Sequence, residues 1–461
     1  MSFFGLDIAL SALRAQQMAM NVTGNNIANA GTESYHRQEA VFVPSSTIRS
    51  TGTILSGGNP QIGTGVLIQT VRRVQNTYIE NQIRLQNQEL GMWDYRNESL
   101  KQIEAVLGEP GNLGLSATLD KFWNSWEELA STPDSLTAKI SVVQAGTSVC
   151  DRIKSLFNNF RQLQARVDTA LVDNASEINR LAHEIADINK EITAGSDSVT
   201  QPNDMLDRRD QLIGQLSKLV PIQVSGSGGL SFMVSVSGKN LIQGGHVTEV
   251  ALGDSPTGWT SLVWTDDGTD FVANGGEVKA QIIIRDDVLG GHITELNSIA
   301  QTIISRVNEL HTTGTLPDGT ACGNFFTPGG DASNISIEAS LVNSPAGVGV
   351  GTSGTAGDNS LALAMSAVRD ETLINGQTIG GAYAGLVATI GTQAREAITQ
   401  TEVHNLSVQQ LETQRDSVSG VSMDEEMVNM VKFQQAYNAA ARIMSVLDSM
   451  LDTLINKTGV G

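Results

Sequence analysis

The sequence is poor in cysteine and in positive charge, and each shortage excludes a class of protein. Its 461 residues include two cysteines, Cys150 and Cys322, too few for a disulfide framework. One disulfide bond between them is still an alternative, although Cys150 lies in a helical pattern typical of a small buried residue. Lysine and arginine total 29 against 49 aspartates and glutamates, a formal net charge of −20. Because so acidic a surface repels phosphate, we expect no nucleic-acid partner.

Long apolar runs and aromatic residues are also scarce. No apolar run approaches the ~20 residues that a membrane-spanning helix needs, so we expect no membrane insertion. The first basic residue, Arg14, follows the first apolar residues instead of preceding them, which is not the layout of a signal peptide. We therefore expect a protein that is cytoplasmic or exported without cleavage. Aromatic residues make up 5% of the chain and glycine 46 residues, a composition found in extended assemblies.

What is abundant is helical periodicity, and both ends of the chain carry the same pattern. From Phe3 to Ile27, and again from Met430 to Leu454, mostly apolar residues recur at alternating steps of three and four. This is the spacing of a helix that buries one stripe against another helix. We expect the terminal helices to pair like a coiled coil and to form an assembly interface at Leu6, Leu10, Leu13, Met20, Ile27, Met430, Phe433, Tyr437, Met444, Leu447, Leu451 and Leu454.

The interior alternates between helical and extended patterns. Residues 135–195 contain no proline and keep one apolar stripe with a small change of phase, which predicts one very long helix or two in tandem. Residues 30–75 and 221–284 show strand-like alternation, and the last strand is expected at 278–284. Further helices are expected at about 75–107, 115–131, 203–219, 286–312, 361–369 and 381–419.

This order predicts a nested, mainly α fold with an inserted β domain. At this length, two to four domains are expected. Residues 1–70 with 420–461 would form a terminal-helix assembly domain, and 71–220 with 285–419 a helical bundle. Residues 221–284 would form a β domain that buries a small core of its own.

Two segments resemble catalytic motifs by letters alone. His183 and Glu184 match the start of the helical zinc-protease motif, but Asp187 stands where the second histidine is needed. Segment 349–354 matches the dinucleotide glycine pattern, but no strand–turn–helix unit surrounds it. The six histidines show no metal-ligand spacing. A solvated helix face is therefore favoured over a metal site, and we expect no cofactor.

Three charged clusters are interpreted as turns and surfaces. The aspartate cluster indicates a hairpin turn instead of a calcium loop, because the remaining calcium ligands are missing: Asp266, Asp267 and Asp270 around Gly268. The Arg72–Arg73 and Arg208–Arg209 pairs are interpreted as solvated charges.

The N-terminal segment then carries a family resemblance. Residues 25–38 contain Asn25-Asn26-Ile27-Ala28-Asn29 and end in Tyr35-His36-Arg37-Gln38. This segment closely resembles the N-terminal signature of the flagellar axial proteins, namely rod, hook and hook-associated proteins. Those families usually have Pro-Gly where this chain has Glu33-Ser34, which makes the turn less rigid.

The C-terminus and the middle narrow the resemblance. Residues 419–427 and 433–442 are similar to the C-terminal signature of the same group, with acids at 424–426 in the first turn of a helix. The segment 203–212 and the residues Tyr35 to Gln38 resemble the FlgK family of hook-associated proteins. Hook protein resembles the chain only at its ends, and flagellin lacks the Asn-Asn-Ile-Ala-Asn motif.

The resemblance implies a structural protein and not an enzyme. It implies a layer of the extracellular flagellar tube at the junction of hook and filament, with the helices inside and the β domain outside. Export would use the flagellar export apparatus and a dedicated chaperone. The implied partners are copies of itself, hook protein and hook-associated protein 3. The alternatives are hook or distal rod protein and, from another class, a metal-dependent hydrolase that uses His183 and Glu184.

Overall fold

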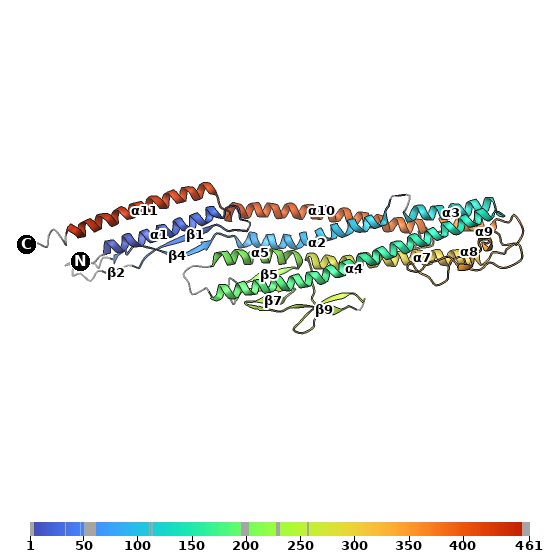
Figure 1. The fold of residues 1–461 in the computed structure, drawn as a ribbon, viewed down its shortest axis with the longest axis horizontal. Helices are drawn as coiled ribbons and strands as arrows, with labels where there is room; N and C mark the ends of the chain where they lie inside the picture. Colours follow the sequence, from blue (N-terminus) through green and yellow to red (C-terminus); the bar gives the residue numbers. More distant parts are fainter. Residues whose placement is uncertain are drawn as a thin grey trace, which may run out of the picture.

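The computed structural model is an elongated molecule in which α1 begins and α11 ends at the same end (Figure 1). It describes residues 4–32, 34–46, 48–49, 61–109, 111, 114–194, 202–226, 231–255 and 258–453. The helices are α1 (Phe4–Ala28), α2 (Thr77–Leu107), α3 (Leu115–Ser131), α4 (Leu136–Ala194), α5 (Asn203–Leu219), α6 (Gly276–Ile282), η2 (Ile283–Leu289), α7 (Gly290–His311), α8 (Ala339–Asn343), η3 (Pro345–Gly347), α9 (Ser360–Ala367), η4 (Val368–Asp370), α10 (Ile379–Ser419) and α11 (Met423–Asp452). The strands are β1 (Gln38–Pro44), β2 (Ile48–Arg49), β3 (Gln61–Ile62), β4 (Val66–Arg73), β5 (Ile222–Ser225), β6 (Met233–Val236), β7 (Lys239–Gln243), β8 (His246–Val247), β9 (Val250–Asp254) and β10 (Thr260–Trp264).

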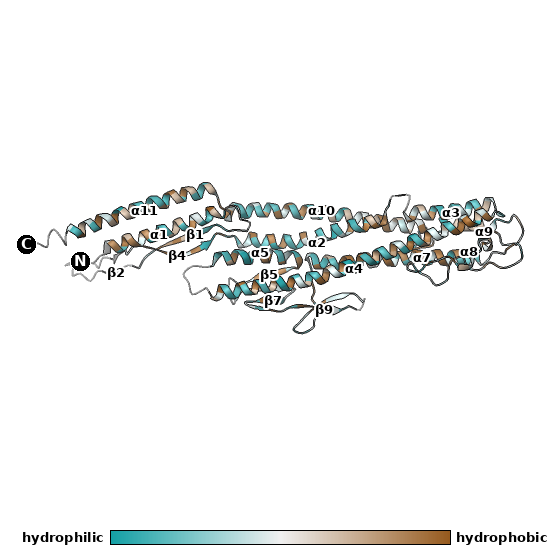
Figure 2. Ribbon diagram, viewed as in Figure 1, coloured by the Kyte–Doolittle hydropathy of each residue, from teal (hydrophilic) through white to brown (hydrophobic). Residues whose placement is uncertain are grey.

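The terminal helices α1 and α11 form an antiparallel pair. Gly5 lies against Leu447, and Gly24, nearer the other end of α1, lies against Met430. Strands β1 and β4 form an antiparallel ribbon beside α1, with a bulge after Val41. Apolar turns recur along both terminal helices as well as along the bundle (Figure 2). The expected pairing of the two ends of the chain is confirmed.

The bundle is built from α2, α3, α4, α7 and α10. Helix α4 is one continuous helix of 59 residues, which decides between the two alternatives left by its sequence. Helix α2 ends at Gly108, whose φ of 63° is the left-handed conformation that glycine adopts without strain. The first core lies where these helices meet and includes the buried rings of Phe122, Trp126 and Phe325. The mainly α fold is confirmed.

One expected strand is a helix. The alternating apolar pattern of residues 278–284 predicts a strand, but these residues belong to α6 and the π-helical segment η2. Both faces of this segment are covered: Val278, Ala280 and Ile284 are buried, and so are the polar Gln281 and Arg285. An element buried all round shows no helical period, so the apolar run alone could not separate strand from helix.

The β insertion has no core of its own. Strands β5–β8 form one sheet, and β9 and β10 form a hairpin. Their apolar residues pack with α4, α5 and α6 in one shared second core, to which α4 contributes Ile178 and Leu181. The expectation of an independent core is therefore wrong. The division of the chain into three domains remains our interpretation.

No helix in the described residues is long and apolar enough to cross a membrane.

Candidate assembly interface

The signature residues gather where the terminal helices meet the bundle. We call this place the joint. It is made of Asn26, Tyr35, His36 and Gln38 from the N-terminal segment, Arg73 and Glu80 from β4 and α2, Asp204, Asp207 and Asp210 from α5, and Glu426 from α11. Four segments that are distant in sequence meet here.

Asn26 is the hydrogen-bonding centre of the joint and is 1% exposed. Its Nδ2 donates to Gln38 O (2.9 Å) and to Glu426 Oε2 (3.1 Å). Its Oδ1 accepts from Gln38 N (2.9 Å) and from the Tyr35 hydroxyl (2.9 Å). All four contacts need a neutral amide, which is both donor and acceptor.

A buried ion cluster lies beside Asn26. The Asp207 carboxylate contacts His36 Nδ1 at 2.8 Å and Arg73 Nη1 at 2.7 Å. Arg73 Nη1 also contacts Asp210 at 2.8 Å, and Glu80 lies 3.5 Å from His36 Nε2. Burial acts to lower the pKa of His36, but hydrogen bonding to the carboxylates of Asp207 and Glu80 outweighs it and raises the pKa to about 9. At neutral pH His36 is therefore a cation held between carboxylates.

The next signature residue, Arg37, ties the joint to the C-terminal helices. Its backbone N donates to Ser419 O (2.8 Å) at the end of α10, and its O accepts from Val74 N (2.8 Å). Its guanidinium contacts Glu425 at 3.0 Å in the first turn of α11. Three residues earlier, Ser34 has a φ of 64°, the left-handed conformation that glycine adopts without strain.

The other signature residues play a local part. Asn29 Nδ2 donates to Asn25 Oδ1 (2.8 Å) on the exposed side of the last turn of α1. Ile27 is half-buried and Ala28 is exposed. The signature thus combines a helix end with the joint that follows it.

The expected interface stripes face each other within the chain. In α1, Leu6, Leu10, Leu13, Met20 and Ile27 are half-buried; in α11, so are Met430, Phe433, Tyr437, Met444, Leu447 and Leu451. Phe433 also reaches the ring of Phe42 on β1, 6.1 Å between centroids. Leu454 lies outside the described residues. The part that these residues play between subunits stays a prediction.

Helix α11 also has a second apolar face, which was not predicted from the sequence. Its members are exposed and lie roughly 80–160° around the helix from the stripe that faces α1, at ~100° per residue. We call this set the α11 outer face: Met427, Val431, Ile443, Val446 and Met450. Two short runs outside the main stripe were a usable signal, one from Met427 to Val431 at a step of 4 and one from Ile443 to Met450 at steps of 3 and 4. A helix that is apolar on two faces has two surfaces to cover.

The prediction that both arginine pairs are solvated is right for one arginine of each pair and wrong for the other. Arg72 and Arg208 are exposed, but Arg73 is part of the joint. Arg209 is buried, donates to Asn189 Oδ1 (3.1 Å) and lies over the ring of Phe232, 3.9 Å from its centroid.

The two segments that resemble catalytic motifs show no catalytic arrangement in the described residues. Exposed His183 contacts Glu249 at 2.8 Å, Asp187 contacts Lys190 at 2.8 Å, and Glu184 contacts Arg180. Among the described residues, no group of three His, Cys, Asp or Glu side chains is placed to hold a metal ion. Segment 349–354 is a loop between η3 and α9.

The aspartate cluster forms a turn, as expected. Asp266 and Asp267 contact Lys239 at 2.6 and 2.7 Å, and Asp267 accepts from Thr269 N (3.0 Å). Asp270 pairs with Val263 in an antiparallel bridge, which confirms the hairpin turn. Both cysteines are free and buried.

Comparison with known proteins gives three domain matches and relatives of full length. Residues 100–326 match the flagellar hook-associated protein FlgK helical domain. Residues 6–35 match the flagella basal body rod protein domain, and 413–457 the C-terminal domain of basal body rod FlgEFG proteins.

The relatives share one name. Flagellar hook-associated protein 1 of Bacillus subtilis is 31% identical over 100% of this chain and 99% of its own length. The Salmonella typhimurium protein of that name is 26% identical over 97% of this chain and 98% of its own. A solved structure, the flagellar hook junction protein FlgK from Burkholderia pseudomallei, has a TM-score of 0.66 at 15% identity and covers 74% of this chain and all of its own. That likeness shows the same fold. The chain belongs to the FlgK family of flagellar hook-associated proteins.

Proposed function

We propose that this chain is a structural subunit of the extracellular flagellum that joins the hook to the filament. The observation that carries the proposal is similarity over the whole chain to proteins named for hook association. Rod-type matches at the two ends alone would fit hook or distal rod protein equally well. The FlgK helical domain between them favours the junction.

The geometry suits a part that transmits force. The α1/α11 pair would assemble with its neighbours, while the bundle bears the load between layers. Buried charges at the joint fix the angle between the two, because breaking a buried ion pair costs about 3–5 kcal/mol. Residues 1–70 with 420–461 would be the inner assembly domain, and the β strands would point outward.

The proposed partners are copies of the same chain, hook protein on one side and hook-associated protein 3 on the other. Export would proceed without cleavage through the flagellar export apparatus with a dedicated chaperone. We propose no enzymatic activity. His183, Glu184 and Asp187 each have a surface ion-pair partner, an arrangement that supports a solvated helix face over a hydrolase centre.

Deletion of the gene tests the proposal. We expect electron microscopy to show complete hooks without filaments, and flagellin shed into the medium. Cells without hooks would point to a rod protein, and cells with normal filaments would contradict the proposal. Complementation with His183→Ala should restore filaments fully, whereas stoichiometric zinc lost in that variant would support the hydrolase.

A further inference from the structure

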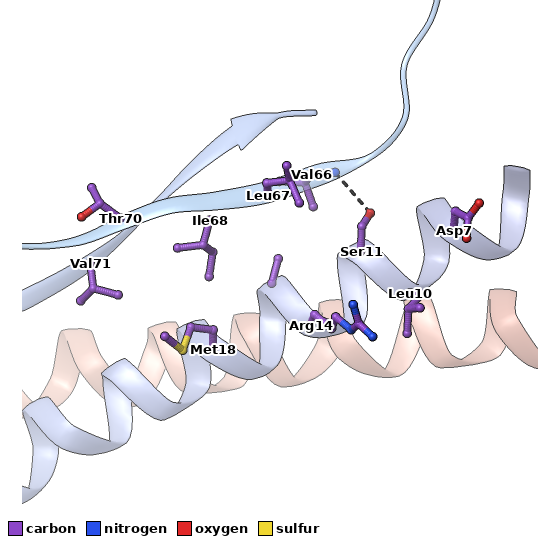
Figure 3. A pocket seen from close by; sticks show the side chains of 11 residues that line it. Asp7, Leu10, Ser11, Arg14, Met18, Val66, Leu67, Ile68, Thr70 and Val71 are labelled. Carbon is purple, nitrogen blue, oxygen red and sulfur yellow. Dashed lines mark hydrogen bonds between the residues drawn. The ribbon is translucent and has the colours of Figure 1, made fainter. Parts of the chain in front are cut away.

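An open groove runs between α1 and β4, on the side of α1 away from α11 (Figure 3). Its volume is about 390 Å³. Ile68 and Val71 point from β4 toward the helix, and Met18 lines the groove from α1. Ser11 Oγ accepts from Val66 N (3.4 Å) at one end of the groove. We call it the α1/β4 groove.

Both charged residues of α1 line the groove. The helix has two charged residues in its 25, Asp7 and Arg14, and both line the groove. Neither has an ion-pair partner within the described part of the chain. The groove is otherwise apolar and carries one unpaired carboxylate and one unpaired guanidinium, so its carboxylate end suits an apolar helix face that carries a cation.

The α11 outer face has this chemistry. Its apolar residues are exposed, with Val431 54% and Val446 51% accessible. Two cations, Lys432 and Arg442, lie on the same side of the helix, and among the described residues neither has an ion-pair partner. The face points away from α1 and the groove opens on the far side of α1, so one copy cannot bring its own two surfaces together.

We propose that the α11 outer face of one copy docks in the α1/β4 groove of the next copy. The two surfaces differ, so the contact is head-to-tail and each copy offers both halves. Such contacts propagate into a ring or a helix instead of stopping at a dimer. The inference rests on the proposed function, and it names the surfaces through which copies meet.

The lengths of the two surfaces agree. Copies that share one long-axis direction bring α11 antiparallel to the neighbouring α1, as within one chain. Met18 lies 11 residues after Asp7, and Val431 lies 11 residues before Arg442. If Asp7 pairs with Arg442 in an antiparallel arrangement, Met18 and Val431 therefore come opposite each other. Eleven residues span about 16 Å on both helices, so one register satisfies the ion pair and the apolar contact.

Disulfide cross-linking in isolated hook–filament structures tests the register. The double variant Met18→Cys/Val431→Cys should give a ladder of cross-linked multimers on mild oxidation, and each single variant should give none. The native Cys150 and Cys322 are buried and contribute little background. The matched control is Met18→Cys/Leu252→Cys, because Leu252 is as exposed as Val431, at 53%, but lies on β9; it should give no ladder.

Exchanging the charges of Asp7 and Arg442 is a second test of the docking. Asp7→Arg and Arg442→Asp should each lower the number of attached filaments several-fold, and the double variant should recover most of it. Absence of a ladder, a ladder in the control, an intrachain product, or no recovery would overturn the docking. Because the deletion strain tests the junction role separately, bare hooks there combined with any of these results would reject the docking alone.

Discussion

The side chain of Asn26 pairs with the backbone of Gln38 through both of its amide atoms. Nδ2 donates to Gln38 O and Oδ1 accepts from Gln38 N, each at 2.9 Å. The end of α1 thereby holds the start of β1 as a neighbouring strand would. The same amide donates to Glu426 at the start of α11, so one residue connects both ends of the chain.

Replacing Asn26 by aspartate should open the joint. The shape is unchanged, but both donated hydrogen bonds are lost and a second carboxylate is placed beside buried Glu426. We expect a loss of about 2–4 kcal/mol in the free energy of unfolding, since unpaired buried charges are costly. Thermal melting of the purified chain measures it. The neighbouring Asn25→Asp is exposed and serves as the control, with little change expected.

His36 makes the joint sensitive to alkaline pH. Its pKa is about 9 in the folded chain and 6.5 when unperturbed. Between these values the folded state keeps a proton that the unfolded state has released, so the stabilisation is full below about pH 6.5 and is lost as pH rises through 9. The groups that face His36 are Asp207, Glu80 and Arg73. Melting temperature should fall across this window in the native chain, and His36→Gln should remove most of the slope; equal slopes would contradict the assignment.

Substitutions at the adjacent residues Leu447 and Val446 test separately the pairing of α1 with α11 and the assembly of copies. Leu447 lies against Gly5 in α1, so Leu447→Asp should separate α1 from α11 in the isolated monomer, at a cost of several kcal/mol. Val446 is on the α11 outer face, so Val446→Asp should leave monomer helicity unchanged but prevent filament attachment. Circular dichroism and filament counts give the two readouts. Identical behaviour of both variants would show that the two faces are not distinct.

Gly91 lies at a close approach of α2 and α5. A Cβ on Gly91 would lie 2.2 Å from Lys218 O, so Gly91→Ala must push two backbones apart and should destabilise the chain by about 1–3 kcal/mol. Gly214 in α5 has nothing within 4 Å of its Cβ position. There the same substitution should stabilise the helix by about 0.5–1 kcal/mol. Gly91→Ala should lower the melting temperature of the chain, and Gly214→Ala should raise it.

Replacing 222–275 by a Gly/Ser linker should damage the parent helix. Ile178 and Leu181 of α4 are fully buried against these strands and would become exposed to water. We therefore expect loss of protection from proteolysis over the second half of α4. A variant that stays as resistant as the native chain would show that α4 does not depend on the shared core.

The sequence by itself determined the helices and the partnership of the chain ends. Each long helix has an apolar stripe whose period is visible locally, and clear stop signals such as Gly108 close it. Two matching stripes at the ends predicted the α1/α11 pair. Periodicity failed at 278–284, because burial on every side removes the polar face that reveals a helix.

Only the tertiary structure decided where the polar residues act. His36 and Asp207 are 171 residues apart in sequence, and Asn26 and Glu426 are 400 apart. Such long-range contacts produce no periodic pattern in the sequence. The sequence therefore predicted Arg73 to be a surface charge, whereas the fold places it on β4 against the carboxylates of α5. The same holds for the α11 outer face. Whether an apolar residue is core or interface depends on what covers it, and the folded chain leaves Val431 and Val446 without cover among its described residues.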